Sequence, residues 1–197
     1  MSYFPFFLDL SGKSCIIVGD GKVARRKEKT LRSYGGDVFV YGAGEWSFEQ
    51  LKDAFLVIAA TNDRSCNQTI GRFCKEHKIW VNVADSKEES DFLFPSTIQE
   101  DPISIGICTS GNSPLVSRTL KEQIRELLPE HMAEVAKFMG EIRDEIKEIP
   151  LEGEKRKALF SAIYQKAEQK QRALTKKEVA SVLKSMFGDE YDNISKK

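Results

Sequence analysis

Four short apolar runs, separated by segments long enough for helices, constrain the fold of this chain more than any other feature. They occupy residues 14–18, 38–41, 55–60 and 79–84. Each run is nearly continuous in apolar side chains, as is typical of strands buried on both faces of a parallel sheet. The pattern predicts strands that alternate with crossover helices, and therefore an α/β domain whose ligands bind at the carboxyl ends of its strands.

A glycine-rich motif of the form G-x-G-x-x-A follows the first run directly and opens the helix expected after it. Its first glycine would permit a tight turn, its second would let a pyrophosphate approach the backbone, and its alanine would let the helix pack closely on the sheet. Free N–H groups at the helix start would bind phosphates. The motif predicts a dinucleotide site, with a glycine-rich turn that binds no ligand as the alternative. The residues are Gly19, Asp20, Gly21, Lys22, Val23 and Ala24.

The end of the second run bears on the choice between NAD and NADP. An acidic residue at this place usually binds the NAD ribose, but here Tyr41 is followed by Gly42, Ala43 and Gly44, and the nearest acid is Glu45. No lysine or arginine stands there to neutralise a 2′-phosphate. The sequence therefore favours NAD, with the adenosine resting on the backbone of Ala43 and Gly44.

Polar residues follow the third and fourth runs. Thr61 and Asn62 would either contact the cofactor ribose or begin a turn. Asp85 follows the fourth run, at the edge of the crevice where a nicotinamide and its substrate should meet, and it is a candidate proton acceptor. The spacing of Asp85 and Glu88 is also that of a helix capping box, which the sequence alone favours over a catalytic role.

The alternation of strands and helices stops near Phe94. Two apolar segments, 94–98 and 103–108, flank a turn at Asp101-Pro102 with no room for a crossover helix, which predicts an antiparallel strand pair. A helix should then start at Ser113, a capping residue followed by proline. Its apolar residues are expected to form a buried stripe: Leu115, Val116, Leu120, Ile124, Leu127 and Leu128.

The small polar loop before this helix could receive carboxylates on its N–H groups and hydroxyls. A turn with a serine cap accounts for Ser113 and Pro114 but leaves Ser110 and Gly111 without a structural role. The candidate binding residues are Ser110, Gly111, Asn112, Ser113 and Arg118.

The last third of the chain is predicted to be helical and charged. Apolar residues at alternating spacings of three and four form a coiled-coil-like seam that should pack on a partner helix and favours dimerisation. Thr175 and Glu178 predict a capping box. The seam residues are Met132, Val135, Met139, Ile142, Ile146 and Ile149.

Charge and cysteine usage exclude several classes of protein. The chain has 30 basic and 30 acidic residues, so no overall positive field favours nucleic acid. Its four cysteines form no CxxC pair, which favours reduced thiols in a cytoplasmic protein and argues against a zinc site. No basic leader and no membrane-length apolar run is present. His77 and His131 are expected at the surface.

The sequence closely resembles the precorrin-2 dehydrogenase family, which comprises the N-terminal module of bacterial siroheme synthase and its stand-alone relatives. The similarity covers about the first 130 residues in the family's order, whereas the remainder is similar only as a charged helical region. The segments concerned are 4–6, 17–27, 59–63 with Asn67, 81–85, 92–96, 109–114 and 128–129.

This resemblance implies three parts: a Rossmann-type NAD-binding domain (1–94), a dimerisation region with an antiparallel strand pair and a helix (95–128), and a helical domain (129–197). One departure stands out. Between Gly44 and Phe55 the chain is shorter than the usual family member by nearly twenty residues, which leads us to expect a narrower sheet and weaker binding on the adenine side.

The resemblance also implies an activity, the NAD-dependent oxidation of precorrin-2 to sirohydrochlorin in siroheme biosynthesis by a homodimer. Asp85 matches the family's general base, Lys22-Val23 and Ala43-Gly44 match cofactor-binding positions, and Ser110 matches a serine near the tetrapyrrole that is phosphorylated in some relatives. Some members also insert ferrous iron into sirohydrochlorin, so a bifunctional enzyme is the first alternative. A non-catalytic NAD-binding sensor dimer is the second.

Overall fold

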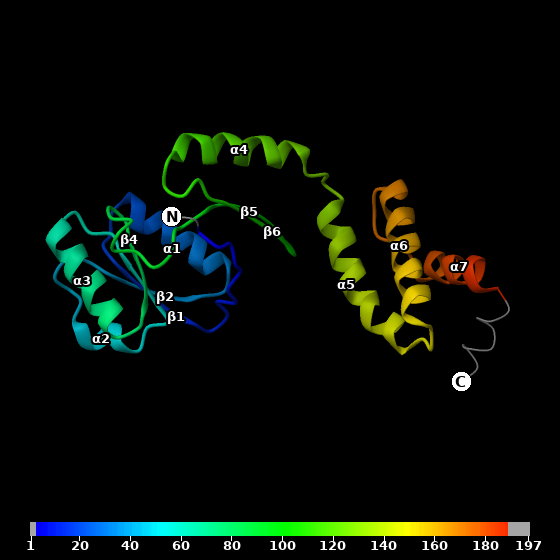
Figure 1. Cartoon of the computed structure of the whole chain (residues 1–197), viewed down its shortest axis with the longest axis horizontal. Coiled ribbons are helices and arrows are strands. Elements are labelled where there is room, and N and C mark those ends of the chain that lie inside the picture. Colours follow the sequence, from blue (N-terminus) through cyan, green and yellow to red (C-terminus); the bar gives the residue numbers. More distant parts are fainter. Residues whose placement is uncertain (1–2, 189–197) are drawn as a thin grey trace. The chain divides into compact units, whose positions relative to one another are not determined.

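The computed structural model describes residues 3–188 and divides the chain into two compact units (Figure 1). The first unit runs to Ser96 and includes Cys108–Ser117, and the second comprises Thr97–Ile107 and the chain from Arg118 onward. Each unit has a hydrophobic core of its own. No helix within residues 3–188 combines the length and hydropathy needed to cross a bilayer.

A parallel four-stranded sheet forms the centre of the first unit. Its strands are β1 (Ser14–Val18), β2 (Asp37–Tyr41), β3 (Leu56–Ala59) and β4 (Trp80–Val83), in the order β2-β1-β3-β4. All four predicted strands are confirmed, and β3 is buried along its whole length, as its continuous apolar run requires. The sheet is narrower than the six strands of a full dinucleotide-binding fold.

Helices cover both faces of this sheet. On one face, Ala24 and Leu31 of α1 (Lys22–Ser33) pack in a core cluster with Ile17 and Ile58. On the other face, residues of α2 (Phe48–Lys52) and α3 (Arg64–Glu76) share a second cluster with the alternate side chains of the strands. Because successive strand residues point to opposite faces, a buried parallel sheet needs both layers.

The segment after Ser96 forms a hairpin and a helix. Strands β5 (Ser96–Glu100) and β6 (Ile103–Ile107) make a two-stranded sheet, and the two residues that join them leave room only for an antiparallel turn, as predicted. Helix α4 (Pro114–Leu127) begins at the predicted proline.

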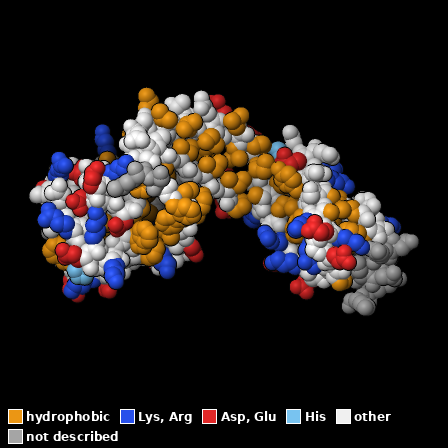
Figure 2. All heavy atoms as spheres, in the orientation of Figure 1, with side chains coloured by type: hydrophobic (Ala, Val, Ile, Leu, Met, Phe, Trp, Pro, Cys, Tyr) orange, Lys and Arg blue, Asp and Glu red, His pale blue; other side chains and the backbone are white. Residues whose placement is uncertain are grey.

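The buried stripe expected on α4 is wrong for this chain. Within the described residues no α4 side chain is buried, and Leu115 and Leu127 are 72% and 79% exposed. Figure 2 shows hydrophobic side chains gathered over this helix. Apolar periodicity indicates which face of a helix avoids water, but it does not say that the same chain covers that face.

The second unit packs three helices, α5 (Met132–Glu148), α6 (Gly153–Lys170) and α7 (Lys176–Phe187), around one core. The seam on α5 does pack on a partner helix, because Val135, Ile142 and Ile146 are buried in one cluster with Leu159 and Ile163 of α6. That partner belongs to the same chain. The seam is therefore occupied within the chain, and its use as evidence for dimerisation is wrong.

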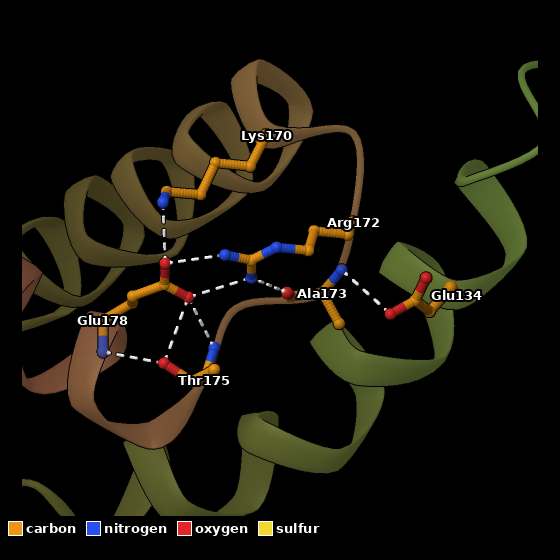
Figure 3. Close-up of polar contacts among 6 residues, drawn as sticks. All are labelled: Glu134, Lys170, Arg172, Ala173, Thr175 and Glu178. Atoms are coloured by element: carbon orange, nitrogen blue, oxygen red, sulfur yellow. Dashed lines mark hydrogen bonds and ion pairs between the residues drawn. The ribbon is translucent and has the colours of Figure 1, made fainter.

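Polar contacts close the α6–α7 corner (Figure 3). Arg172 donates two hydrogen bonds to the carboxylate of Glu178, at 2.9 and 3.0 Å, and Lys170 forms an ion pair with it at 2.7 Å. The predicted capping box of Thr175 and Glu178 is confirmed. His131 is not the surface residue we expected, since its ring bonds to Glu168 at 2.9 Å and its side chain is 14% exposed.

Candidate active site

A cavity of about 400 Å³ lies at the carboxyl ends of the central strands, where the strand order reverses. It is lined by Gly19, Asp20, Gly21, Ala43, Gly44, Ala60, Thr61, Asn62, Asp63 and Cys66. The first, second and third strand ends thus contribute predicted cofactor residues to one cavity. Of the other predicted residues, Lys22 and Val23 lie exposed in the first turn of α1, and Ala24 is buried against the sheet.

Gly19 is required at its position by the backbone around it. Its φ is +125°, and a Cβ built there would lie 2.2 Å from the carbonyl oxygen of Ala60. Its N–H donates to the carbonyl of Tyr41 at 2.8 Å. The glycine therefore draws the ends of β1, β2 and β3 together, which only a residue without a side chain permits.

Gly21 serves a different purpose from Gly19, because the space beside its Cα is open. It precedes the first turn of α1, and in the described chain no side-chain hydrogen bond caps this helix start. A Cβ at Gly21 would contact no described atom within 4 Å and would project into open space. Uncapped N–H groups facing a glycine-lined cavity are what a pyrophosphate needs, so the residues present fit a dinucleotide.

Glu45, the acid nearest to the end of β2, is folded back onto that strand end. Glu45 lies three residues beyond Gly42, but its carboxylate turns back and accepts the Gly42 N–H at 3.1 Å. It thereby stands beside the strand end next to Ala43 and Gly44, which line the cavity. A negative charge at this edge favours a ribose hydroxyl and opposes a 2′-phosphate.

Asp85 is not a helix cap, so the capping-box interpretation is wrong. Residues 84–90, all described, form a turn, named here the Asp85 turn. The carboxylate of Asp85 accepts a hydrogen bond from the side-chain amide of Asn67 at 3.2 Å. Its side chain is exposed, so the carboxylate is accessible to a ligand.

Asn67 joins this carboxylate to the cavity wall. Its side chain is 1% exposed and also bonds both backbone groups of Thr61, accepting from the N–H at 3.0 Å and donating to the carbonyl at 3.1 Å. The ends of β3 and β4 are thus held together through one buried amide. The arrangement sets a carboxylate beside the Thr61 wall of the cavity.

Four of the five candidate substrate residues lie in a tight loop, residues 109–113, named here the Ser110 loop, and the fifth, Arg118, lies on α4. Ser113 caps α4 as predicted, accepting the N–H of Val116 at 3.2 Å. Ser110 and Gly111 both have left-handed backbone, with φ of +54° and +76°. Arg118 pairs with Glu122 of its own helix at 3.1 Å.

Lys27 is a buried cation of the same unit. Its side chain donates to the amide oxygen of Asn82, and its ammonium lies 4.9 Å from the centroid of the Phe94 ring. Burial, with a smaller effect of Arg26, lowers the pKa of Lys27 to about 8. Asn82 donates in turn to the carbonyl of Phe92 at 2.8 Å, so α1, β4 and the chain beyond the Asp85 turn are tied together.

Comparison with known proteins shows which proteins this chain is similar to. Residues 6–96 match a family described as putative NAD(P)-binding. The chain is 34% identical to the siroheme synthase of Actinobacillus succinogenes over 166 residues, covering 75% of this chain and 35% of that protein. It is 33% identical to siroheme synthase 1 of Yersinia pestis over 167 residues, with the same coverage. Over three quarters of its length, this chain is similar to part of the siroheme synthases.

The chain spans about a third of the length of the curated proteins it matches. Its fold is similar to that of a solved structure named SirC, precorrin-2 dehydrogenase, with a TM-score of 0.68 and 22% sequence identity. That match covers 93% of this chain and 98% of the other. The comparison shows the fold, and it agrees with the predicted α/β class and Rossmann-type domain.

Sequence reasoning missed several residues of this site. Asp63 and Cys66 line the cavity at the start of α3, and the side chain of Asp63 caps that helix, a role which its place before the helix could have indicated. Asn67 lay in a segment of family resemblance but received no role. Lys87, in the Asp85 turn, had no signal in the sequence.

Proposed function

We propose that this chain oxidises precorrin-2 to sirohydrochlorin, with NAD as the hydride acceptor and Asp85 as the general base. The observation that carries the proposal is the buried amide of Asn67, which holds the Asp85 carboxylate and the Thr61 wall of the cavity together. The names of the relatives supply the reaction class. We also propose the cytoplasmic location that the cysteine usage predicts. All four cysteines lie within the described residues and are unpaired.

The cofactor part of the proposal uses the cavity. Bound NAD would accept a hydride from the tetrapyrrole. Gly21 and the first turn of α1 would bind its pyrophosphate, while Ala43 and Gly44 would support the adenosine. The carboxylate of Glu45, held beside the end of β2, favours NAD over NADP by repelling a 2′-phosphate.

The reaction also releases a proton, and in our proposal Asp85 takes it. It lies beyond β4, exposed, with an oxygen directed at Asn67, and within residues 3–188 no lysine or arginine forms an ion pair with it. In our proposal the Ser110 loop receives substrate carboxylates through Ser110, Gly111, Asn112 and Ser113, with Arg118 as a further cation.

An anaerobic assay with precorrin-2 and NAD tests this function by following NADH and the tetrapyrrole absorbance. We expect NADH formation by the unmodified protein. Asp85→Asn should lower turnover roughly a hundredfold or more while leaving the Kd for NAD nearly unchanged. Equal turnover in this variant would contradict the assignment of the base.

Two further outcomes separate the alternatives. An iron-dependent spectral change, faster than the protein-free control after ferrous iron is added, would make the enzyme bifunctional. No turnover together with tight NAD binding would favour a sensor and would contradict the proposed activity.

We further propose a homodimer in which residues 95–128 form the interface. The support is the exposed apolar face of α4, where Leu115, Val116 and Leu120 are 72%, 48% and 39% exposed. Apolar surface of this kind on one helix is stabilised when a second copy covers it. The three-part division at residues 94 and 128 belongs to the same proposal.

Light scattering after gel filtration tests the dimer. The double variant Leu115→Glu/Leu127→Glu should shift the mass from two copies to one, whereas Gln123→Glu, on an exposed position of the same helix, should not. A monomeric unmodified protein would overturn this proposal.

A further inference from the structure

A single lysine links the Asp85 turn to the Ser110 loop. The ammonium of Lys87 donates to the carbonyl oxygen of Ser110 at 2.7 Å, across 23 positions of the sequence. The side chain is half-buried, and its Cδ lies 3.5 Å from where a Cβ on Gly111 would be. The ammonium also lies 5.6 Å from the centroid of the Tyr3 ring.

The Asp85 turn is a firm base for this link because several hydrogen bonds fix it internally. The hydroxyl of Ser90 donates to the carbonyl of Ser86 at 2.7 Å and accepts the N–H of Val83 at 2.9 Å. Lys75 of α3 holds the turn from outside, donating to the carbonyl of Glu88 at 2.9 Å. The backbone between Asp85 and Lys87 therefore has little freedom.

The Ser110 loop needs such a link because its backbone is strained. A serine in the left-handed region is less stable than one in an extended or helical conformation, because its Cβ crowds the following carbonyl oxygen. The loop has internal hydrogen bonds, from the N–H of Asn112 to the carbonyl of Thr109 and between Thr109 and Ser113. None of these bonds uses the Ser110 carbonyl, which Lys87 engages with a charge-assisted bond.

We propose that Lys87 is a positioning residue that holds the Ser110 loop, and thus the seat of the substrate, at a set distance from Asp85. The inference rests on the proposed function and adds a residue that no motif in the sequence indicates. Lys87 is not among the residues that line the cavity, and its ammonium bonds to the loop. Its removal therefore acts on the binding of the substrate, because a loosened loop must be ordered again each time the substrate binds.

The test compares Lys87→Met with Lys87→Arg, which keeps a charged donor, and with Lys29→Met. Lys29 is exposed on α1, so its variant removes the same charge from the same unit without touching the loop. We expect Lys87→Met to raise the KM for precorrin-2 at least about tenfold, with kcat within about threefold and the Kd for NAD unchanged. Lys87→Arg should restore most of the loss.

A second measurement works on the unliganded protein and does not depend on the reaction. Hydrogen exchange at the Asn112 amide, followed by NMR, should accelerate at least about tenfold in Lys87→Met and remain unchanged in Lys29→Met. Unchanged exchange in Lys87→Met would overturn the inference, as would a raised KM that Lys87→Arg fails to improve. If the unmodified protein shows no turnover, the proposed function fails. The exchange result then still supports or overturns the role of Lys87 in holding the Ser110 loop.

Discussion

The side-chain amide of Asn67 donates to the carboxylate of Asp85 at 3.2 Å, although the two residues lie 18 positions apart. The same side chain accepts the N–H of Thr61 and donates to its carbonyl. One buried residue thus joins the turn after β3 to the turn after β4, and the cofactor cavity to the candidate base.

Replacing this amide should therefore damage both stability and function. In Asn67→Leu, two backbone groups of Thr61 lose their partner, and we expect the free energy of unfolding to fall by about 2–4 kcal/mol. Thr61→Val keeps those backbone bonds, removes the hydroxyl bonds to Asn67 and Asp63, and should cost about 1 kcal/mol. Urea unfolding followed by the fluorescence of Trp46 and Trp80 measures both. A Leu variant as stable as the unmodified protein would contradict the role given to Asn67.

Two glycines of the motif should fail in different ways. Gly19→Ala places a Cβ against the backbone of Ala60 and Thr61 at a positive φ, so we expect a loss of about 2–4 kcal/mol in unfolding free energy. Gly21→Ala meets no described atom and should keep the fold within about 1 kcal/mol, while its methyl group weakens NAD binding at least about tenfold. Urea unfolding and calorimetric NAD titration separate the two effects. Undiminished NAD affinity in Gly21→Ala would place the pyrophosphate elsewhere.

The lowered pKa of Lys27 predicts that the folded protein becomes more stable as the pH rises from about 8 to 10.5. Its pKa is about 8 in the folded protein, against an ordinary lysine pKa of 10.5 in the unfolded chain, so the unfolded chain binds the extra proton between these values. The folded protein should gain up to about 3 kcal/mol relative to Lys27→Met as the pH rises through this window. Urea unfolding of both proteins between about pH 7 and pH 10.5 measures the difference.

The comparison with Lys27→Met also removes the effect of two buried thiols. Burial raises the pKa of Cys15 to about 11 and that of Cys74 to about 12, which lowers stability above the ordinary thiol pKa of 9.0 in both proteins equally. A difference between the two proteins that does not change with pH would show that Lys27 stays charged when folded.

Glu178 should make the helical unit sensitive to acid. Hydrogen bonds from Arg172, followed by those from Lys170 and Thr175, hold the pKa of Glu178 far below its ordinary value of 4.5 (Figure 3). This contribution to stability is present above pH 4.5 and is lost as the pH falls further, because the unfolded chain takes up the proton first. Glu178→Gln should therefore lower the thermal midpoint at neutral pH, with a difference that shrinks in acid.

Circular dichroism melts at a series of pH values measure this difference. Glu154→Gln is the matched control, because Glu154 forms an exposed pair with Lys157 whose loss should change the midpoint little. Equal shifts in the two variants would mean that the cluster around Glu178 adds nothing beyond an ordinary surface pair.

Much of the site could be predicted from the sequence because its parts are local. The strand ends at Gly19, Ala43 and Thr61 were predicted from apolar runs and turn residues, and a parallel sheet necessarily brings its carboxyl ends to one edge. Asp85 could not be decided in this way. Its spacing to Glu88 is compatible with a cap or with a free carboxylate, and only the absence of a helix in residues 84–90, all of them described, removes the cap.

The sequence by itself determined the four strands, the glycine turn and the helix caps at Ser113 and Thr175, because each depends on residues within one or two turns of chain. The tertiary structure alone decided which surfaces and side chains meet. It gave the α5 seam a partner in α6, left the apolar face of α4 exposed, turned Glu45 back to Gly42 and joined Lys87 to Ser110. Periodicity encodes which face of an element is apolar, whereas the group that contacts it depends on how distant segments come together.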